Sequence, residues 1–199
     1  MEENVYAPPS ATLVREEAVA ADFYVVSKRK FYTLFIMTLG LYQVYWYYRN
    51  WKLYRRATGE KVLPVMRAIF AVFFVHGLFR RVQAGLRGTG KSFEWNPTAL
   101  AWWVVGLMLV SEVVDRLSGW EIGAPYTDAL GLALIPTLAC ALVKGQAAIN
   151  ACCGDPTGTS NDCFTLANCA WIVLGGLLYA LIAAGLAIRM LGLEAAVAR

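Results

Sequence analysis

The chain carries little charge and few of the residues that enzymes use for catalysis. Only 16% of its 199 residues are charged, whereas soluble domains average about 25%. His76 is the only histidine in the sequence and lies directly before a glycine in a predicted membrane-surface helix, so no Ser/His/Asp or Cys/His catalytic set is proposed around it. Cys152, Cys153 and Cys163 lack the paired spacing of a zinc site and have no nearby histidine. The sequence therefore predicts no enzyme, no metal site and no cofactor.

Apolar residues are abundant and are gathered into long runs. They make up 58% of the chain, against about 45–50% in soluble domains. A helix needs about 20 apolar residues to cross a bilayer. Runs of that length occupy about 98–117, 127–150 and 165–190, and Asn96 and Pro97 supply a cap for the first. The predicted fold class is an all-α integral membrane protein with three clear transmembrane helices.

Charge is distributed unevenly along the chain. Residues 28–91 hold thirteen Lys or Arg against one acid, Glu60, whereas residues 1–27 and 92–199 are both acidic on balance. Residues 1–27 also lack the basic and apolar regions of a secretory signal. We therefore divide the chain into a disordered tail (1–27), a basic, aromatic, membrane-interface helical pair (28–91) and a three-helix transmembrane bundle (92–199).

The helical pair is expected at about 29–57 and 62–87. Residues 31–48 would form about 27 Å of helix, which is barely a span. Basic groups lie on both sides of this stretch, so an upright helix would place one group outside, against the positive-inside rule. We therefore favour a re-entrant or interfacial pair, with the first member bent near Gly40. Two short spans, giving five in total, are the alternative.

The basic residues of this pair are predicted to contact anionic lipid headgroups. In the second member, polar residues at helical spacing form a stripe on one side of the helix, and apolar side chains lie on the opposite side. This arrangement is typical of an interfacial amphipathic helix. Nucleic acid is not expected as a partner, because the same residues directly flank apolar helices and the lipid interface accounts for them. The predicted headgroup contacts are Lys28, Arg29, Lys30, Arg49, Lys52, Arg55, Arg56, His76, Arg80 and Arg87.

Several segments are similar to a known family. VSKRKF (26–31), TLGLY (38–42) and YWYYRNWK (45–52), followed by Pro64 and an aromatic-rich stretch, resemble a family of small, uncharacterised bacterial multi-pass inner-membrane proteins. The likeness covers about residues 24–82. The NVYAPP segment (4–9) is similar to the N-termini of several bacterial membrane proteins, although Val5 replaces a frequent Pro. The resemblance implies a bacterial inner-membrane location and no particular activity.

The segment 85–92, GLRGTGKS, matches the G-x-x-x-x-G-K-S pattern of a phosphate-binding loop. That loop works between a buried strand and the start of a helix, where backbone N–H groups face the phosphates. Here an amphipathic helix precedes the segment, and no helix begins until Pro97. We interpret it as a basic glycine linker, with nucleotide binding as the alternative.

The three spans contain two further features of interest. Glu112 and Asp115 lie near the end of the first span and are candidates for an ion or proton path, although charges this close to a helix end also reach headgroups or water. In the third span, Gly176, Ala180 and Ala184 form a small-residue row that would allow close helix packing. Such a row suits a homo-oligomer or a membrane-protein partner.

Together these features predict a multi-pass protein of the bacterial inner membrane with a cytoplasmic N-terminus. The favoured function is that of a non-enzymatic accessory or scaffold protein that binds anionic lipid. The alternative is a small transporter or an ion or proton channel subunit that uses Glu112 and Asp115.

Overall fold

The computed structural model describes residues 23–191, and all regular structure within that range is helical. Its three longest helices are α6 (Pro97–Gly119), α7 (Tyr126–Cys152) and α8 (Leu166–Met190), and each is long and apolar enough to cross a membrane. Both ends of each of these three helices lie within two residues of the predicted positions, so the prediction of three long apolar helices is confirmed. Asn96 and Thr165 accept backbone N–H bonds as the N-caps of α6 and α8.

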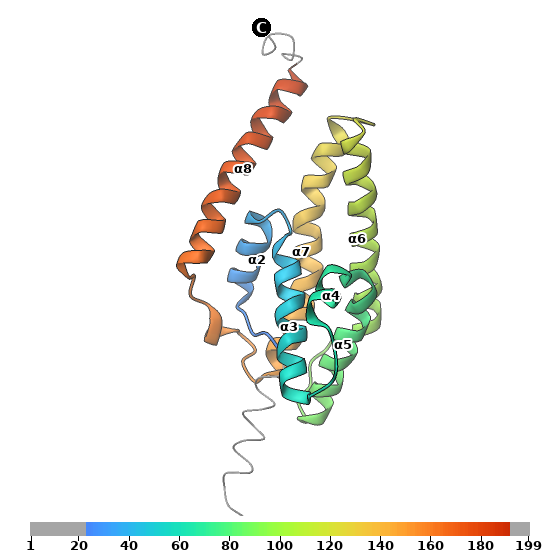
Figure 1. The fold of residues 1–199 in the computed structure, drawn as a ribbon, viewed down its shortest axis with the longest axis vertical. Coiled ribbons are helices and arrows are strands. Elements are labelled where there is room, and N and C mark those ends of the chain that lie inside the picture. Colours follow the sequence, from blue (N-terminus) through green and yellow to red (C-terminus); the bar gives the residue numbers. More distant parts are fainter. Residues whose placement is uncertain (1–22, 192–199) are drawn as a thin grey trace, which may run out of the picture.

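The first part of the basic segment is a helical hairpin. Helix α2 (Lys28–Met37) runs up beside α7, and α3 (Tyr42–Thr58) returns towards the same end of the molecule (Figure 1). The turn lies beside the middle of α7. Leu39 and Gly40 both have positive φ, 52° and 84°, and glycine adopts this region without strain. The predicted bend near Gly40 is therefore present, and neither arm runs the full length of α7.

The second predicted helix is divided in two. Helix α4 (Pro64–Ile69) and helix α5 (Ala71–Gly88) are separated at Phe70, whose ψ of 40° is not helical. Helix α5 then packs against α6 and α7 through one apolar face. Its opposite side and α4 leave a group of large apolar side chains exposed, which are Leu63, Val65, Met66, Ile69, Phe70 and Phe73. Exposed apolar residues gathered in this way favour contact with lipid.

An extended strap, residues 23–27, precedes α2 and packs against both α3 and α7. Three fully buried amide side chains pair with its main chain: Asn50 from α3, and Gln146 and Asn150 from α7. The predicted tail boundary at residue 27 is therefore too late, because Phe23, Tyr24 and Val26 belong to the core. The remainder of the predicted tail, residues 1–22, lies outside the described residues.

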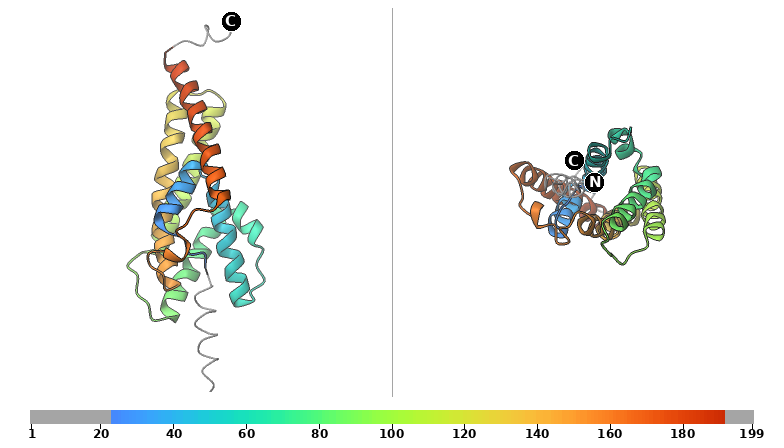
Figure 2. Two further views of the ribbon diagram at one scale, coloured as in Figure 1. Left: turned by 90° about the vertical axis from the view of Figure 1, so that its left-hand side faces the viewer. Right: turned by 90° about the horizontal axis from the view of Figure 1, so that it is seen from below.

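The arrangement of α8 sets the shape of the upper half of the molecule. Helix α8 crosses α2 around Gly175 and Tyr179, so the hairpin lies between α8 and α7 (Figures 1 and 2). Towards its C-terminal end α8 leans back over the α6–α7 turn, where Arg189 pairs with Glu121 and Asp128. Among the residues of α8, Gly175 alone is buried. Most of this apolar helix therefore faces outwards.

Candidate functional site

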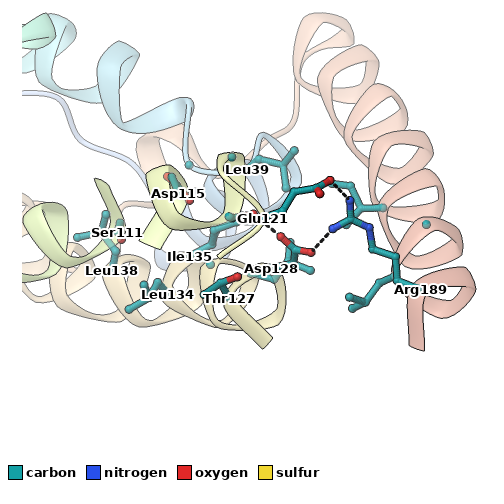
Figure 3. Close-up of a pocket in the computed structure, with 18 of the residues that line it drawn as sticks. Leu39, Ser111, Asp115, Glu121, Thr127, Asp128, Leu134, Ile135, Leu138 and Arg189 are labelled. Carbon is teal, nitrogen blue, oxygen red and sulfur yellow. Dashed lines mark hydrogen bonds and ion pairs between the residues drawn. The ribbon is translucent and has the colours of Figure 1, made fainter. Parts of the chain in front are cut away.

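A cavity of about 760 Å³ lies above the hairpin turn. Its floor is formed by the turn, with Leu39 and Gly40, and its walls are α6, α7 and α8 (Figure 3). The α6–α7 turn and Arg189 complete it at the end farther from the N-terminus of α2. The cavity lies where the hairpin separates α8 from α7 on one side of it. On the other side, the ion pairs of Arg189 connect the end of α8 to the α6–α7 turn.

Some charged side chains in this cavity form ion pairs, and one carboxylate does not pair with any described residue. Arg189 donates to Glu121 Oε1 at 3.1 Å and to Asp128 Oδ2 at 3.2 Å, and Ser118 Oγ donates to Asp128. Asp128 lies in the first turn of α7, where the helix dipole favours negative charge. Asp115, which also lines the cavity, makes no hydrogen bond or ion pair with any described residue (Figure 3). The described residues therefore contribute three carboxylates and one guanidinium to the lining.

The rest of the lining is largely apolar, with isolated polar atoms. Oε1 of Gln43 is buried and accepts no hydrogen bond from any described residue. Ser111 adds a hydroxyl on the α6 side. The apolar walls are formed by Phe35, Leu39, Leu132, Leu134, Ile135, Leu138, Ile182 and Leu186. One cavity thus combines carboxylates with the surface needed to hold an apolar chain.

The two candidate ion-path residues have different surroundings. Glu112 accepts hydrogen bonds from Arg116 at 2.9 and 3.0 Å, one turn farther along α6. Glu112 and Asp115 both line a smaller pocket of about 360 Å³ beside α4 and α5, and Asp115 also reaches the large cavity. The structure therefore brings the two carboxylates together at one pocket, but Asp115 alone of the pair faces the large cavity.

Sequence reasoning missed Glu121, Asp128 and Arg189. Each resembles an ordinary charge at a helix end, and Arg189 lies more than sixty positions from either acid. Their meeting depends on the lean of α8, which no local pattern encodes. The one available signal was Asp128 in the first turn of a span.

The predicted headgroup contacts divide into exposed and enclosed residues. Lys30 is buried, and Arg49 and His76 are half-buried. The Arg49 guanidinium lies over the rings of Tyr24 and Tyr45, and the His76 ring lies 4.6 Å from that of Trp102. The other seven are exposed: Lys28, Arg29, Lys52, Arg55, Arg56, Arg80 and Arg87. The exposed basic residues of α2, the second half of α3 and the C-terminal half of α5 lie towards one end of the molecule (Figure 1).

Lys30 holds the 153–165 loop against the start of α2. Its Nζ donates to Asn161 Oδ1 at 2.7 Å and to the main-chain oxygen of Cys163 at 2.6 Å. Asp162 accepts from Ser27 Oγ at 2.6 Å and pairs with Arg29, and these interactions lower the pKa of Asp162. Lys30 is therefore engaged within the protein, in contrast to its predicted role at lipid.

A cluster of arginines and aromatic rings lies between α3, α4 and α5. The Arg67 guanidinium lies 4.2 Å from the Trp51 ring, and Arg81 lies over Trp51 and Tyr54. Arg81 also donates to both carboxylate oxygens of Glu60, and this hydrogen bonding lowers the pKa of Glu60. The cluster fixes the loop between α3 and α4, so these two arginines have a packing role that sequence reasoning did not identify.

The GLRGTGKS segment does not have the geometry of a phosphate-binding loop. Residues 85–88 are the last turn of α5, and no strand precedes them within the described residues. Gly85 lets α5 approach α7, because a Cβ there would lie 2.7 Å from Cys152 Sγ. Lys91 Nζ donates to the main-chain oxygen of Cys152 at 3.1 Å. The glycine and the lysine therefore serve helix packing.

The predicted small-residue row of α8, Gly176, Ala180 and Ala184, lies beside the point where α8 crosses α2. A Cβ at Gly175 would lie 1.6 Å from the Met37 main-chain oxygen, whereas one at Gly176 would lie 3.6 Å from the end of the Met37 side chain. Ala180 and Ala184 are exposed. The intramolecular crossing therefore depends on Gly175, and the prediction of a partner at Gly176, Ala180 and Ala184 stays a prediction.

In residues 23–191 no group of three His, Cys, Asp or Glu side chains could hold a metal ion. Comparisons of the chain with protein-family models, with curated proteins and with solved structures found no match.

Proposed function

We propose that the chain is a non-enzymatic accessory or scaffold protein of the bacterial inner membrane, and that its basic end binds anionic lipid on the cytoplasmic side. The observation that carries this proposal is the uneven distribution of exposed cations along the long axis. The exposed cations of α2, α3 and α5 gather towards one end, whereas single arginines, Arg116 of α6 and Arg189 of α8, lie towards the other. This is the polarity that the positive-inside rule favours.

Exposed aromatic residues support the same placement. Trp102 and Trp103 near the start of α6 are 64% and 61% exposed, and Trp120 just past its end is 70% exposed. Between Trp103 and Trp120 an α-helix rises about 26 Å, close to the hydrocarbon thickness of about 30 Å. Tryptophans at two such levels are typical of the two interfaces of a bilayer. The α2–α3 hairpin then enters from the basic side and turns near mid-depth.

The proposal is tested by lipid preference. The purified protein would be titrated with phosphatidylglycerol or with phosphatidylcholine, and the bound lipid would be counted by native mass spectrometry. The triple variant Lys52→Gln, Arg55→Gln, Arg56→Gln removes exposed charges at the basic end, each worth up to about 1 kcal/mol at an anionic leaflet. We expect at least a fivefold loss of the preference for phosphatidylglycerol. The matched control, Arg116→Gln, lies towards the other end and should keep the preference. A wild-type protein that does not distinguish the two lipids contradicts the proposal.

The second candidate function is a small transporter or an ion or proton channel subunit. It is favoured by one observation: Asp115, which has no hydrogen-bond or ion-pair partner within residues 23–191, lines both the large cavity and the side pocket. Ionisable groups within spans often mark such paths. Ion or proton flux in liposomes that is lost in Asp115→Asn, Glu112→Gln would support it. Absence of flux from folded wild-type protein would count against it.

A further inference from the structure

The large cavity has the size and the mixed lining of a ligand site. Sites for drug-sized molecules have volumes of about 300–1,000 Å³ and combine apolar walls with a few convergent polar groups. At about 760 Å³ the cavity lies within that range. Leu132, Ile135, Ile182 and Leu186 supply apolar wall from two different helices. The polar groups are concentrated along α6 and at the α6–α7 turn.

The charge in the cavity favours a cation. Arg189 already serves Glu121 and Asp128 through its two terminal nitrogens. That leaves the Asp115 carboxylate without a hydrogen-bond or ion-pair partner among the described residues. Asp115 is exposed and lies one turn before the end of α6, but it lines this apolar-walled cavity, where a cation from a ligand could pair with its charge.

A second observation points to a hydrogen-bond donor. Gln43 Oε1, which is buried, belongs to the same lining and has no partner within residues 23–191. Gln43 comes from the hairpin and Asp115 from α6, so the two acceptors reach the cavity from different elements. Buried acceptors are normally satisfied. A protonated amine carries both the charge that Asp115 lacks and the N–H groups that Gln43 Oε1 can accept.

The position of α8 indicates that the ligand also has an apolar part. Helix α8 packs mainly on α2 rather than on α7, so the side of the cavity between α8 and α7 is not closed by helix packing. Most of α8 is apolar and exposed, so this side faces lipid in a bilayer. A molecule that enters laterally would pass between α7 and α8, and its chain would lie among apolar lining residues of both helices, such as Ile135 and Ile182.

We propose that the cavity binds an ammonium group carried on an apolar chain. Asp115 holds the ammonium group and Gln43 Oε1 accepts one of its N–H groups. The chain lies between Leu132 and Ile135 of α7 and Ile182 and Leu186 of α8. A bare metal ion fits less well, because the described residues offer no cluster of three ligating side chains. This site is separate from the basic end and does not depend on the proposed lipid preference there.

The ammonium group could come from an aminophospholipid of the bilayer or from a free amphiphilic amine. The first source is tested by extracting the protein from a bilayer of phosphatidylethanolamine and phosphatidylglycerol and identifying retained lipid by native mass spectrometry. The second is tested by calorimetric titration with dodecylamine in maltoside micelles, with dodecanol as the uncharged probe of equal length.

We expect one-to-one binding of dodecylamine at least tenfold tighter than that of dodecanol. Asp115→Asn should weaken dodecylamine binding at least tenfold. Glu112→Gln, which removes the carboxylate paired with Arg116 on the same helix, should leave it unchanged. Ile182→Trp should abolish binding by filling the cavity from α8, and it keeps the test decisive if Asp115→Asn fails to fold.

Phosphatidylethanolamine retained by the wild type and lost in Asp115→Asn would assign the site to a lipid headgroup. Saturable dodecylamine binding without retained phosphatidylethanolamine would assign it to a free amine. Equal affinity for dodecylamine and dodecanol, or equal binding by wild type and folded Ile182→Trp, would overturn the proposal. So would the absence of both retained lipid and saturable amine binding.

Discussion

Gln146 of α7 donates a hydrogen bond from Nε2 to the main-chain oxygen of Tyr24, at 3.0 Å and across 122 positions of sequence. The same side chain accepts from Trp46 Nε1 on α3. It is fully buried, so no water can replace either bond. One amide therefore ties the strap, the hairpin and the longest span together.

Replacing this amide tests the role of the strap. Gln146→Leu leaves the Tyr24 oxygen and Trp46 Nε1 buried without these partners, at a cost of about 1–3 kcal/mol for each unsatisfied group. We expect a lower Tm in detergent and faster proteolysis. Gln43→Leu is the control, because its Oε1 has no partner among the described residues. Equal Tm values for Gln146→Leu and wild type would show that the strap contributes little.

The α8–α2 crossing offers a pair of adjacent glycines with opposite expectations. Gly175→Ala would place Cβ against the Met37 main chain, which cannot move aside without shifting α2. Overpacking of this kind costs about 1–3 kcal/mol. Gly176→Ala meets only the flexible end of the Met37 side chain. Thermal unfolding of both variants should show a clear loss for Gly175→Ala and little change for Gly176→Ala. The reverse order would mean that α8 packs differently.

Asp155 predicts an acid-dependent contribution to stability. Its carboxylate accepts from the N–H groups of Gly158, Thr159 and Ser160, and the bonds from Ser160 and then Thr159 lower its pKa. A lowered pKa in the folded state stabilises the protein above the ordinary Asp value of about 3.9. The contribution is lost as pH falls towards the folded value.

The measurement is Tm against pH for wild type and Asp155→Ala. We expect Asp155→Ala to lower Tm by a constant amount between pH 7 and about pH 5, and the difference to shrink below about pH 4. Glu94→Ala, at an exposed carboxylate in another loop, serves as the control and should change Tm little at any pH. If the Tm difference between wild type and Asp155→Ala grew as the pH fell, the lowered pKa assigned to Asp155 would be wrong.

The three spans and the bend at Gly40 could be predicted because both are local properties. A run of about 20 apolar residues marks a candidate span by its own length and composition. Basic groups on both sides of residues 31–48 argue against a crossing in a similarly local way. The hairpin between α2 and α3 follows from these two constraints.

The strap and most of the cavity could not be predicted in this way. Tyr24 and Gln146 are far apart in sequence, and Asp128 meets Arg189 only because α8 leans over the α6–α7 turn. Lys30 belongs to a basic run and was assigned to lipid, yet its burial depends on where the 153–165 loop docks. Composition identified the charged groups, and tertiary packing decided their partners.

The most direct test of the membrane arrangement is the side on which Ala57 lies. Four single-cysteine variants would be made in a chain whose natural cysteines are replaced by alanine: Ala57→Cys, Ser92→Cys, Thr157→Cys and Ile122→Cys. Each variant would be labelled with an impermeant maleimide in inverted and in right-side-out vesicles. All four positions are exposed. A re-entrant hairpin requires that Ala57→Cys, Ser92→Cys and Thr157→Cys label from the cytoplasmic side and that Ile122→Cys labels from the opposite side. Labelling of Ala57→Cys on the same side as Ile122→Cys would show that residues 31–48 cross the bilayer, and the re-entrant arrangement would be wrong.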